Sequence, residues 1–351
     1  MKGLLKNAIS VLIILVIVVL FNSCAKQEDS TEEKTTTTQA SQTEITTTEP
    51  EEVTTTTPAE EPPIEADEYN PAMWKLSDDN GNVMYMLGSM HVLNDGDYPI
   101  PDKVMDAYNL CDSVAVECDV VNVDMEESLA MASYLVYPDG TFITDHVSDE
   151  AYQAMKSLLQ EYDLFSPLYT LYNPFMFQSL ISTGAATAAG FTAEGYDMYF
   201  IKLAEADSKE VLEVEGIALQ SEKAFSADEA TMNAIAKTYI GITTEELEQS
   251  MVELHEAWRT GTLEEYFESY TMEDDGTDLS IFTEEELALV EDYNAQLLEG
   301  RNYYMADRAE EMLASGDTVF YIVGAAHYYG DEGLVELLTQ RGYTVEEYYN
   351  N

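Results

Sequence analysis

Two histidines of this chain, His91 and His327, end the same short pattern, Gly-x-x-His, at residues 88–91 and 324–327. Each pattern directly follows an apolar run that predicts a β-strand, so each imidazole is expected just beyond a strand's carboxyl end. Ligands of open α/β sheets bind at that edge. Because paired imidazoles suit either a metal ion or proton transfer, the two patterns indicate a chemical site.

Two glutamates are expected at the same edge. Glu117 follows the predicted strand 114–116, and Glu215 follows the predicted strand 211–214. Two histidines with one or two carboxylates and an open position could bind a divalent metal and activate water. A packing role competes for either histidine alone, and a solvent-exposed or capping role competes for Glu117 alone. Their joint placement favours a site.

The other histidines, one acidic run and two cysteines carry weaker signals. His146 and His255 lie in helical, polar stretches, which predicts that both are surface residues. Residues 274–278 lack the full spacing and the closing glutamate of a calcium loop, so they are interpreted as an acidic turn. Cys111 and Cys118 flank a strand and lie roughly 20 Å apart in extended chain, beyond the reach of a disulfide. Both are predicted to be buried thiols.

The elements that position these residues alternate between strands and helices. Two runs joined by an Asn-Gly turn at 80–81 predict a hairpin, and a helix is expected from Pro101. Helical segments fill most of 125–301, and a strand, a helix and a last strand follow from residue 318. This order predicts an α/β fold: a central sheet with strand-end Gly-x-x-His motifs and a large helical insertion.

The helical insertion could form a lid over the site or a wall beside it, and the sequence leaves this open. Its aromatic residues could line a groove, but their spacing fits core packing better. These residues are Tyr134, Tyr137, Tyr172 and Phe175.

The first 24 residues have the features of a secretory signal. Lys2 and Lys6 precede an apolar run at 11–20, which is shorter than a membrane-spanning helix requires. Residues 20–24, Leu-Phe-Asn-Ser-Cys, resemble a bacterial lipobox, which predicts cleavage and lipidation at Cys24. The competing interpretation is a free cysteine beside an ordinary signal peptide or an uncleaved anchor.

The next segment, 25–68, is rich in Thr, Glu and Pro and cannot bury enough apolar area to fold, so a disordered spacer is predicted. Residues 69–351 are then the catalytic domain. The whole chain has 68 acidic and 15 basic residues, a net charge of −53. Such a polyanion gains no counterion-release affinity for nucleic acid, which excludes that class of partner. The predicted location is the extracellular face of the membrane, lipid-anchored.

The ordered combination of motifs resembles the TraB/GumN family, which includes the pheromone-shutdown proteins of enterococci and the Tiki proteases of animals. The resemblance spans roughly residues 74–348. The matching segments are residues 85–92, 116–119, 195–200, 214–220, 301–306 and 323–327. The resemblance implies a fold related to erythromycin-esterase-like and ChaN-like proteins. It also implies metal-dependent peptidase activity, shown in the Tiki branch and inferred for most bacterial members.

Carried over residue by residue, the resemblance implies that His91 and His327 are metal ligands, with Glu117 as the third ligand or the general base. It places Glu215 and Arg301 along the same site, where a planar guanidinium could orient a carboxylate or bind a substrate carbonyl. The Tiki branch suggests manganese or cobalt as the ion.

The sequence therefore favours an extracellular, lipid-anchored, metal-dependent peptidase that acts on a peptide or small protein. Two other classes stay open. One is a protein that sequesters a peptide without cutting it, and the other is a protein of the same fold that binds haem or another cofactor. A purely structural surface protein would leave the paired motifs unexplained.

Overall fold

The computed structural model describes residues 69–269 and 277–348. Its centre is a six-stranded sheet with the strand order β4-β3-β5-β2-β1-β6. The strands are β1 (Met73–Ser77), β2 (Val83–Ser89), β3 (Ser113–Val116), β4 (Glu210–Glu213), β5 (Val319–Gly324) and β6 (Thr344–Glu347). β1 is antiparallel to β2 and β6, whereas β2, β5, β3 and β4 pair in parallel. The carboxyl ends of these four parallel strands therefore meet at one edge, as the α/β prediction requires.

The first two strands form the predicted hairpin. Gly81 in its turn has a φ of +89°, a left-handed conformation that glycine adopts without strain. The carboxylate of Asp78 accepts hydrogen bonds from the backbone N–H groups of Asn80 and Asn82, both at 2.9 Å. The turn fixes the register of β2, whose carboxyl end carries the first Gly-x-x-His pattern.

The longer helices begin where their sequences predict. Thr243 and Thr283 start α9 and α11 with capping boxes, which Glu246 and Glu286 complete. The helices are α2 (Asp102–Leu110), α3 (Met125–Tyr134), α4 (Asp149–Glu161), α5 (Pro174–Ala188), α6 (Tyr196–Asp207), α7 (Ile217–Phe225), α8 (Glu229–Lys237), α9 (Thr244–Thr260), α10 (Leu263–Ser269), α11 (Glu284–Ala314) and α12 (Leu334–Gln340). The short 3-10 turns are η2 (Asp95–Asp97), η3 (Ile143–Asp145), η4 (Pro167–Leu171), η5 (Leu279–Ile281) and η6 (Ala325–Tyr328).

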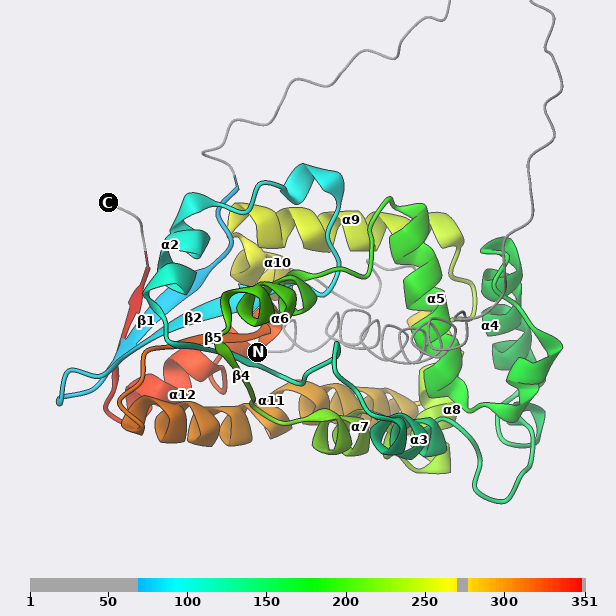
Figure 1. Ribbon diagram of the computed structural model, residues 1–351. Helices are drawn as coiled ribbons and strands as arrows, with labels where there is room; N and C mark the ends of the chain where they lie inside the picture. The colour runs from blue at the N-terminus through cyan, green and yellow to red at the C-terminus, as the bar shows by residue number, and fades with distance from the viewer. Residues whose placement is uncertain (1–68, 270–276, 349–351) are drawn as a thin grey trace, which may run out of the picture.

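Helices cover both faces of the sheet, with α2 and α6 on one side and α11 and α12 on the other (Figure 1). Successive residues of β5 point to opposite faces. Phe320 meets Phe200 of α6, with ring centroids 5.1 Å apart, whereas the Tyr321 hydroxyl donates to the Met305 carbonyl of α11 at 2.8 Å. The fully buried strand β5 thus joins the two halves of the core.

The helical insertion lies beyond the carboxyl edge of the sheet, where α3, α4, α5 and α8 form the right-hand part of Figure 1. Tyr137 and Phe175 are buried in the core, and Tyr134 and Tyr172 pack against it partly buried. The prediction that these aromatic residues serve core packing is therefore confirmed.

Cys111 and Cys118 stand just before and just after β3. Both are buried, and neither forms a disulfide within the part of the chain that the structure describes. Burial raises the pKa of Cys111 to about 12, so its thiol stays protonated. The prediction of two buried thiols is confirmed.

The prediction that His146 and His255 are surface residues is wrong for His255 and holds only in part for His146. His255 is 5% exposed, because α9 turns this position towards Phe191 and Trp258, with ring centroids 4.6 and 5.7 Å away. The polar residues around it in the sequence lie on the outer face of α9, which concealed its burial. The imidazole of His146 is 17% exposed and stacks on the Tyr137 ring at 3.9 Å.

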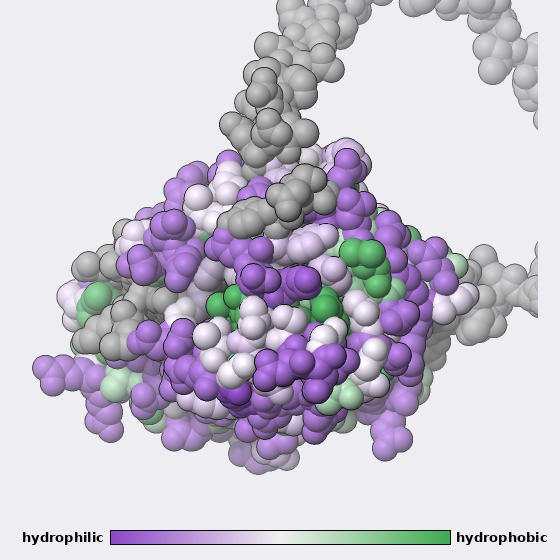
Figure 2. Space-filling view, turned by 90° about the vertical axis from the view of Figure 1, so that its left-hand side faces the viewer, coloured by the Kyte–Doolittle hydropathy of each residue, from purple (hydrophilic) through white to green (hydrophobic). Residues whose placement is uncertain are grey.

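Hydrophilic side chains cover most of the face shown in Figure 2, in keeping with the acidic composition. Within residues 69–269 and 277–348, none of the helices combines the length and the apolar character that a membrane span needs. The predicted signal peptide, Cys24, the 25–68 spacer and most of the 274–278 run lie outside the described residues.

Candidate active site

Five predicted site residues meet at the carboxyl edge of the sheet. His91 follows β2, Glu117 follows β3, Glu215 follows β4 and His327 lies in η6 directly after β5, whereas Arg301 reaches the edge from the middle of α11. Each of these side chains is only 1 to 2% exposed. The structure brings all five together, although they are spread over more than two hundred positions of the sequence.

Arg301 joins the two glutamates through its guanidinium group. Its Nε lies 3.0 Å from both carboxylate oxygens of Glu215, and its Nη2 donates to Glu215 Oε2 and, at 2.6 Å, to Glu117 Oε2. Its Nη1 donates to the backbone carbonyl of Leu297 at 3.4 Å. Each guanidinium nitrogen thus has a partner within the chain, which suits an orienting role better than substrate binding.

Glu117 is also held by neutral donors. Its Oε1 accepts a hydrogen bond from the backbone N–H of Gly324 at 2.6 Å, and its Oε2 accepts one from the Gln220 amide at 2.8 Å. The thiol of Cys118 donates to Gln220 Oε1 at 2.8 Å. Burial by itself raises the pKa of Glu117, but Arg301, the two histidines and the Gly324 N–H together outweigh burial and hold this pKa below its ordinary value. The carboxylate therefore stays ionised.

His91 is backed by a carboxylate from α6. Its Nδ1 lies 2.8 Å from Asp197 Oδ2, and the Ser89 hydroxyl donates to Asp197 Oδ1 at 3.1 Å. A Cβ at Gly195, the N-cap of α6, would come within 2.3 Å of the His91 backbone, so glycine is required for this approach. The acceptor at Nδ1 assigns the proton to that nitrogen and leaves the Nε2 lone pair free.

His327 is backed by an amide instead. Its Nδ1 lies 2.6 Å from Asn302 Oδ1, and Asn302 Nδ2 donates to the Glu332 backbone carbonyl at 2.8 Å. The bond to Glu332 fixes which end of the Asn302 amide faces the imidazole. His327 therefore also carries its proton on Nδ1 and presents the lone pair of Nε2.

The two imidazoles and Glu117 surround one small space at Gly324. A Cβ at Gly324 would lie 3.1 Å from Glu117 Oε1, 3.5 Å from His327 Cδ2 and 3.7 Å from His91 Nε2. The Nε2 atoms of both histidines are buried and have no hydrogen-bond partner among residues 69–269 and 277–348. Buried polar atoms in folded proteins are nearly always hydrogen-bonded. Two unpartnered nitrogens facing the same space therefore mark a place for a ligand.

The different partners give the two histidines different proton affinities. Burial lowers the pKa of His91, but Asp197 outweighs burial and raises this pKa above its usual value. For His327, burial and the charge of Arg301 together lower the pKa to about 3. His327 is therefore neutral at every physiological pH, as a ligand to a metal or a hydrogen-bond acceptor must be.

Asp197, Asn302 and Gln220 are site residues to which the sequence alone assigned no role. Asp197 stands in a Gly-x-Asp helix start, and Asn302 is the neighbour of Arg301 in the sequence. Both signals are visible, but neither says which histidine the side chain would contact. Helix geometry supplies the answer, because α6 and α11 deliver these side chains to the backs of the two imidazoles.

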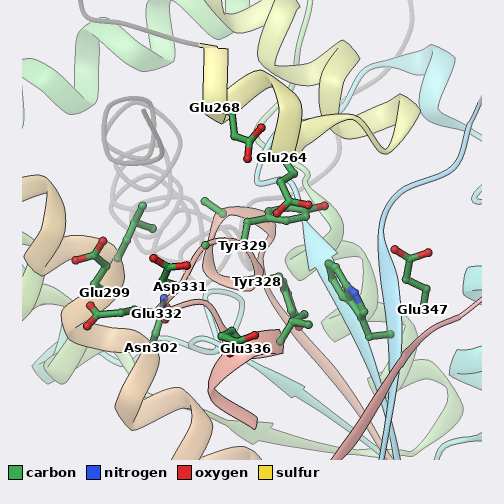
Figure 3. A pocket seen from close by; sticks show the side chains of 15 residues that line it. Glu264, Glu268, Glu299, Asn302, Tyr328, Tyr329, Asp331, Glu332, Glu336 and Glu347 are labelled. Carbon is green, nitrogen blue, oxygen red and sulfur yellow. Dashed lines mark hydrogen bonds between the residues drawn. The ribbon is translucent and has the colours of Figure 1, made fainter. Parts of the chain in front are cut away.

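A cleft of about 1000 Å³ lies beside the site. Asn302, which holds His327, and Ala326, its neighbour in η6, are part of its wall. Figure 3 shows acidic side chains from α10 and α11 around the cleft, with Tyr328 and Tyr329 between them. The cleft thus reaches the residues that back and flank one of the two histidines.

Comparisons with known proteins agree with this architecture at the level of the family. Neither the curated proteins nor the solved structures contain a significant match to the chain. The sequence profile of the TraB/PrgY/gumN family matches residues 72–347. This range includes the whole sheet and every side chain of the site, but not the predicted lipid anchor. The chain therefore belongs to the TraB/PrgY/gumN family.

Proposed function

We propose that the protein is a metal-dependent hydrolase that cleaves peptides, with its reaction centre between His91 and His327. The observation that carries the proposal is the pair of buried, unpartnered Nε2 atoms that face the same space beside Glu117 Oε1. A cation or a water molecule in that space would satisfy both lone pairs. Hydrolysis needs a water molecule held and activated at such a position.

The donor set fits a divalent metal ion. The Nδ1–H of each histidine is bound by an oxygen acceptor, the outer-shell arrangement common to metal-binding imidazoles. His327 Nε2 lies 3.8 Å from Glu117 Oε1, too long for a hydrogen bond. Two ligands with metal bonds of roughly 2.1 Å can be that far apart around one ion. Within the described ranges no group of three or more His, Cys, Asp or Glu could hold a metal ion as the side chains stand, so the fit rests on the types of the donors and on their unpartnered nitrogens.

The charge of the site also favours a cation. Asp197, Glu117 and Glu215 carry three carboxylates, and Arg301 supplies one guanidinium. When both histidines are neutral, as metal ligands must be, two negative charges remain uncompensated in a buried setting, which is costly. A divalent cation would neutralise both. Without one, protons must do so, and burial raises the pKa of Glu215 despite the adjacent Arg301.

In the proposed mechanism the protein holds the metal-binding side chains in fixed positions. His91, His327 and Glu117 would bind the ion, which supplies Lewis-acid chemistry and lowers the pKa of water. Asp197 and Asn302 fix the two imidazoles, and Arg301 keeps Glu117 in place. Glu117 is a better ligand than base, because its lowered pKa makes it a weak proton acceptor.

Glu215 reaches the site through Arg301. Burial raises its pKa, with the opposing pull of Arg301 weaker, so protonated and ionised forms are closer in energy than for Glu117. Its oxygens lie on Arg301 Nε and Nη2, which also contacts Glu117. Because a guanidinium does not release its proton, Glu215 acts by holding Arg301, and through it Glu117, in place rather than by carrying a proton.

The test is cleavage of a mixed peptide library by the full-length chain, stripped of metal and then given manganese or cobalt. We expect metal-restored cleavage in the wild type and none in His327→Ala. The control is His146→Ala, which removes a histidine outside the site and should keep activity. Turnover that persists in the chelated protein or in His327→Ala would overturn the proposal.

The cleavage experiment and a haem titration separate the two rival functions. Stoichiometric protection of an intact peptide, with no turnover under any metal, would identify a sequestering protein. A Soret band after haem addition that His91→Ala and His327→Ala both abolish would identify a haem protein of this fold. In each outcome the Nε2 atoms of His91 and His327 would bind a different ligand.

We further propose that Cys24 is lipidated and anchors the domain at the extracellular face of the membrane, with residues 25–68 as spacer. The support is the basic and apolar start of the sequence and the lipobox-like residues 20–24. Incorporation of labelled fatty acid into the wild type, but not into Cys24→Ala, is the expected result. Equal labelling of both proteins would contradict it.

A further inference from the structure

The turn that carries His91 begins at the carboxyl end of β2, and the last turn of α9 lies against it (Figure 1). The indole N–H of Trp258 in α9 donates to the backbone carbonyl of Gly88 at 2.9 Å. Trp258 is 1% exposed, so this hydrogen bond is shielded from solvent. It joins two segments 170 positions apart in the sequence, one of which supplies a proposed metal ligand.

We propose that Trp258 is a positioning residue for the reaction centre: by holding the Gly88 carbonyl, it sets the position of His91 relative to His327. The inference rests on the proposed metal-dependent hydrolysis and adds to it a residue outside the metal-binding set. Trp258 acts through the backbone of residues 88–91 and not by contact with the ion or the substrate.

Gly88 is the point where the two Gly-x-x-His turns touch each other. A Cβ at Gly88 would lie 3.0 Å from the Cβ of Ala325, so glycine is what permits this close approach. In the parallel pair of β2 and β5, the next residue, Ser89, stands opposite Gly324. A shift of the Gly88 peptide would therefore change the distance between the two imidazoles that surround the space at Gly324.

Trp258 is itself held in place by two aromatic rings. The rings of Tyr69 and Tyr196 meet it edge to face, with centroids 5.9 and 5.1 Å away. The hydroxyl groups of these two tyrosines are hydrogen-bonded to each other at 2.7 Å. Closely packed rings of this kind fix one orientation of the indole, so its N–H stays directed at the Gly88 carbonyl.

The same turn has a second backbone anchor. The N–H of Tyr196, at the start of α6, donates to the Met90 carbonyl at 3.0 Å. The next residue, Asp197, holds His91 Nδ1. Asp197 thus orients the imidazole, whereas Trp258 and Tyr196 fix the backbone that carries it. Loss of the Trp258 hydrogen bond should displace His91 and leave its Nδ1 partner in place.

The first test follows His91 directly and needs no turnover. The metal-free, full-length chain is labelled with carbon-13 at histidine Cε1, so its four histidines each give one NMR cross-peak, assigned by single substitutions. In Trp258→Phe, which removes the N–H donor and keeps an aromatic ring, we expect the His91 cross-peak to move and that of His146 to stay. Tyr293→Phe is the matched control, because it removes a buried aromatic donor to the Ala224 carbonyl and should leave His91 unmoved.

A second variant removes only the hydrogen bond. Trp258→benzothienylalanine keeps the bicyclic ring and replaces its N–H by sulfur. A His91 shift that it shares with Trp258→Phe therefore comes from the lost hydrogen bond and not from a change of ring or a loosened fold.

The last measurement is peptide cleavage with metal present. We expect both Trp258 variants to lower kcat about tenfold with KM within about twofold, since a misplacement of about 1 Å at a reacting group can cost about 100-fold. A His91 cross-peak that both variants leave at its wild-type position would overturn the proposal, as would a loss of kcat no greater than that of Tyr293→Phe. Because the NMR measurement needs no turnover, it tests Trp258 even in a protein that proves not to cleave peptides.

Discussion

Two buried clusters of the described residues combine carboxylate, imidazole and guanidinium groups, and they differ in which atoms they leave without a hydrogen-bond partner. Next to α9, the Asp97 carboxylate lies between a histidine and an arginine. Its Oδ2 is 2.8 Å from His255 Nε2, and its Oδ1 accepts from Arg259 Nη1 at 2.6 Å. The backbone N–H of Asn94 donates to Oδ2 as well, at 2.8 Å. One carboxylate thus meets one guanidinium, and the imidazole Nε2 is hydrogen-bonded to the carboxylate. The unpartnered atom of this cluster is Arg259 Nε, a donor that has no lone pair to offer a ligand.

The cluster at the sheet edge is built differently. Glu117 and Glu215 share the single guanidinium of Arg301. Both imidazoles are hydrogen-bonded through Nδ1, to Asp197 and Asn302, and their Nε2 atoms have no partner among the described residues. The lesson is that residue types do not separate a structural cluster from a reactive one. Unpartnered lone pairs and unbalanced charge separate the two kinds of cluster. Both features lower the stability of the folded protein, so they indicate a site that binds something.

The largest expected effect comes from His327→Ala at the sheet edge. We expect kcat/KM for a cleaved peptide to fall at least about a thousandfold, since a ligand of the proposed ion contributes several kcal/mol to catalysis. Steady-state kinetics would be measured at a temperature where circular dichroism shows a folded chain. Activity within tenfold of the wild type would remove the distinction between the two clusters.

Arg301→Met should give the largest loss of stability. It leaves two buried carboxylates without their cation, and breaking buried ion pairs in this way costs about 3–5 kcal/mol. Arg259→Met is the matched comparison, because it strands one carboxylate that His255 still holds, so we expect a smaller loss. Urea unfolding followed by circular dichroism measures both. Equal losses would mean that the sheet-edge charges are compensated in some other way.

His255→Ala should separate the clusters in the opposite direction. It removes a buried hydrogen bond to a charged carboxylate and leaves space beside Trp258, at a cost of about 2–3 kcal/mol in the free energy of unfolding. Activity per folded molecule should stay within about twofold, because His255 does not reach the reaction centre. A loss of activity comparable to that of His327→Ala would show that the α9 cluster takes part in the reaction.

Asn302→Ala tests the backing of His327 without removing the imidazole. Loss of an outer-shell partner usually costs about 10–100-fold in metal affinity or activity. Asn302→Asp restores an oxygen acceptor for Nδ1–H and should recover most of that loss. Metal affinity and kcat/KM would be measured together for both variants. If Asp is no better than Ala, Asn302 acts through packing alone.

The sequence predicted where in the fold the candidate site residues lie, but not which side chains hydrogen-bond to one another. His91 and His327 could be placed at one edge because both follow apolar runs, and parallel strands end on the same side of a sheet. Glu117 and Glu215 followed from the same rule. Asp197 could not be paired with His91, which is 106 positions away, because that contact depends on the angle at which α6 crosses the sheet.

Burial on helices was the harder part of the prediction. His255 sits among acidic residues in the sequence, yet the face of α9 that carries it is covered by Phe191 and Trp258. The acidic cleft was hidden for a related reason. With 68 acids in the chain, no local pattern distinguishes Glu264 or Glu299 from a solvated surface acid. Only the fold shows which of them converge.

The smallest expected effect is a pH dependence that Asp97→Asn should remove. Burial raises the pKa of Asp97, but His255, the Asn94 N–H and the charge of Arg259 together outweigh burial, so the folded pKa lies below the unfolded value. A lowered pKa contributes stability that is complete above the unfolded pKa of about 3.9 and is lost as the pH falls through the folded pKa. The wild type should therefore lose its advantage over Asp97→Asn between neutral and acid pH. Urea midpoints at pH 7, 5, 4 and 3 measure this, and parallel curves for the two proteins would show that Asp97 does not hold its charge through folding.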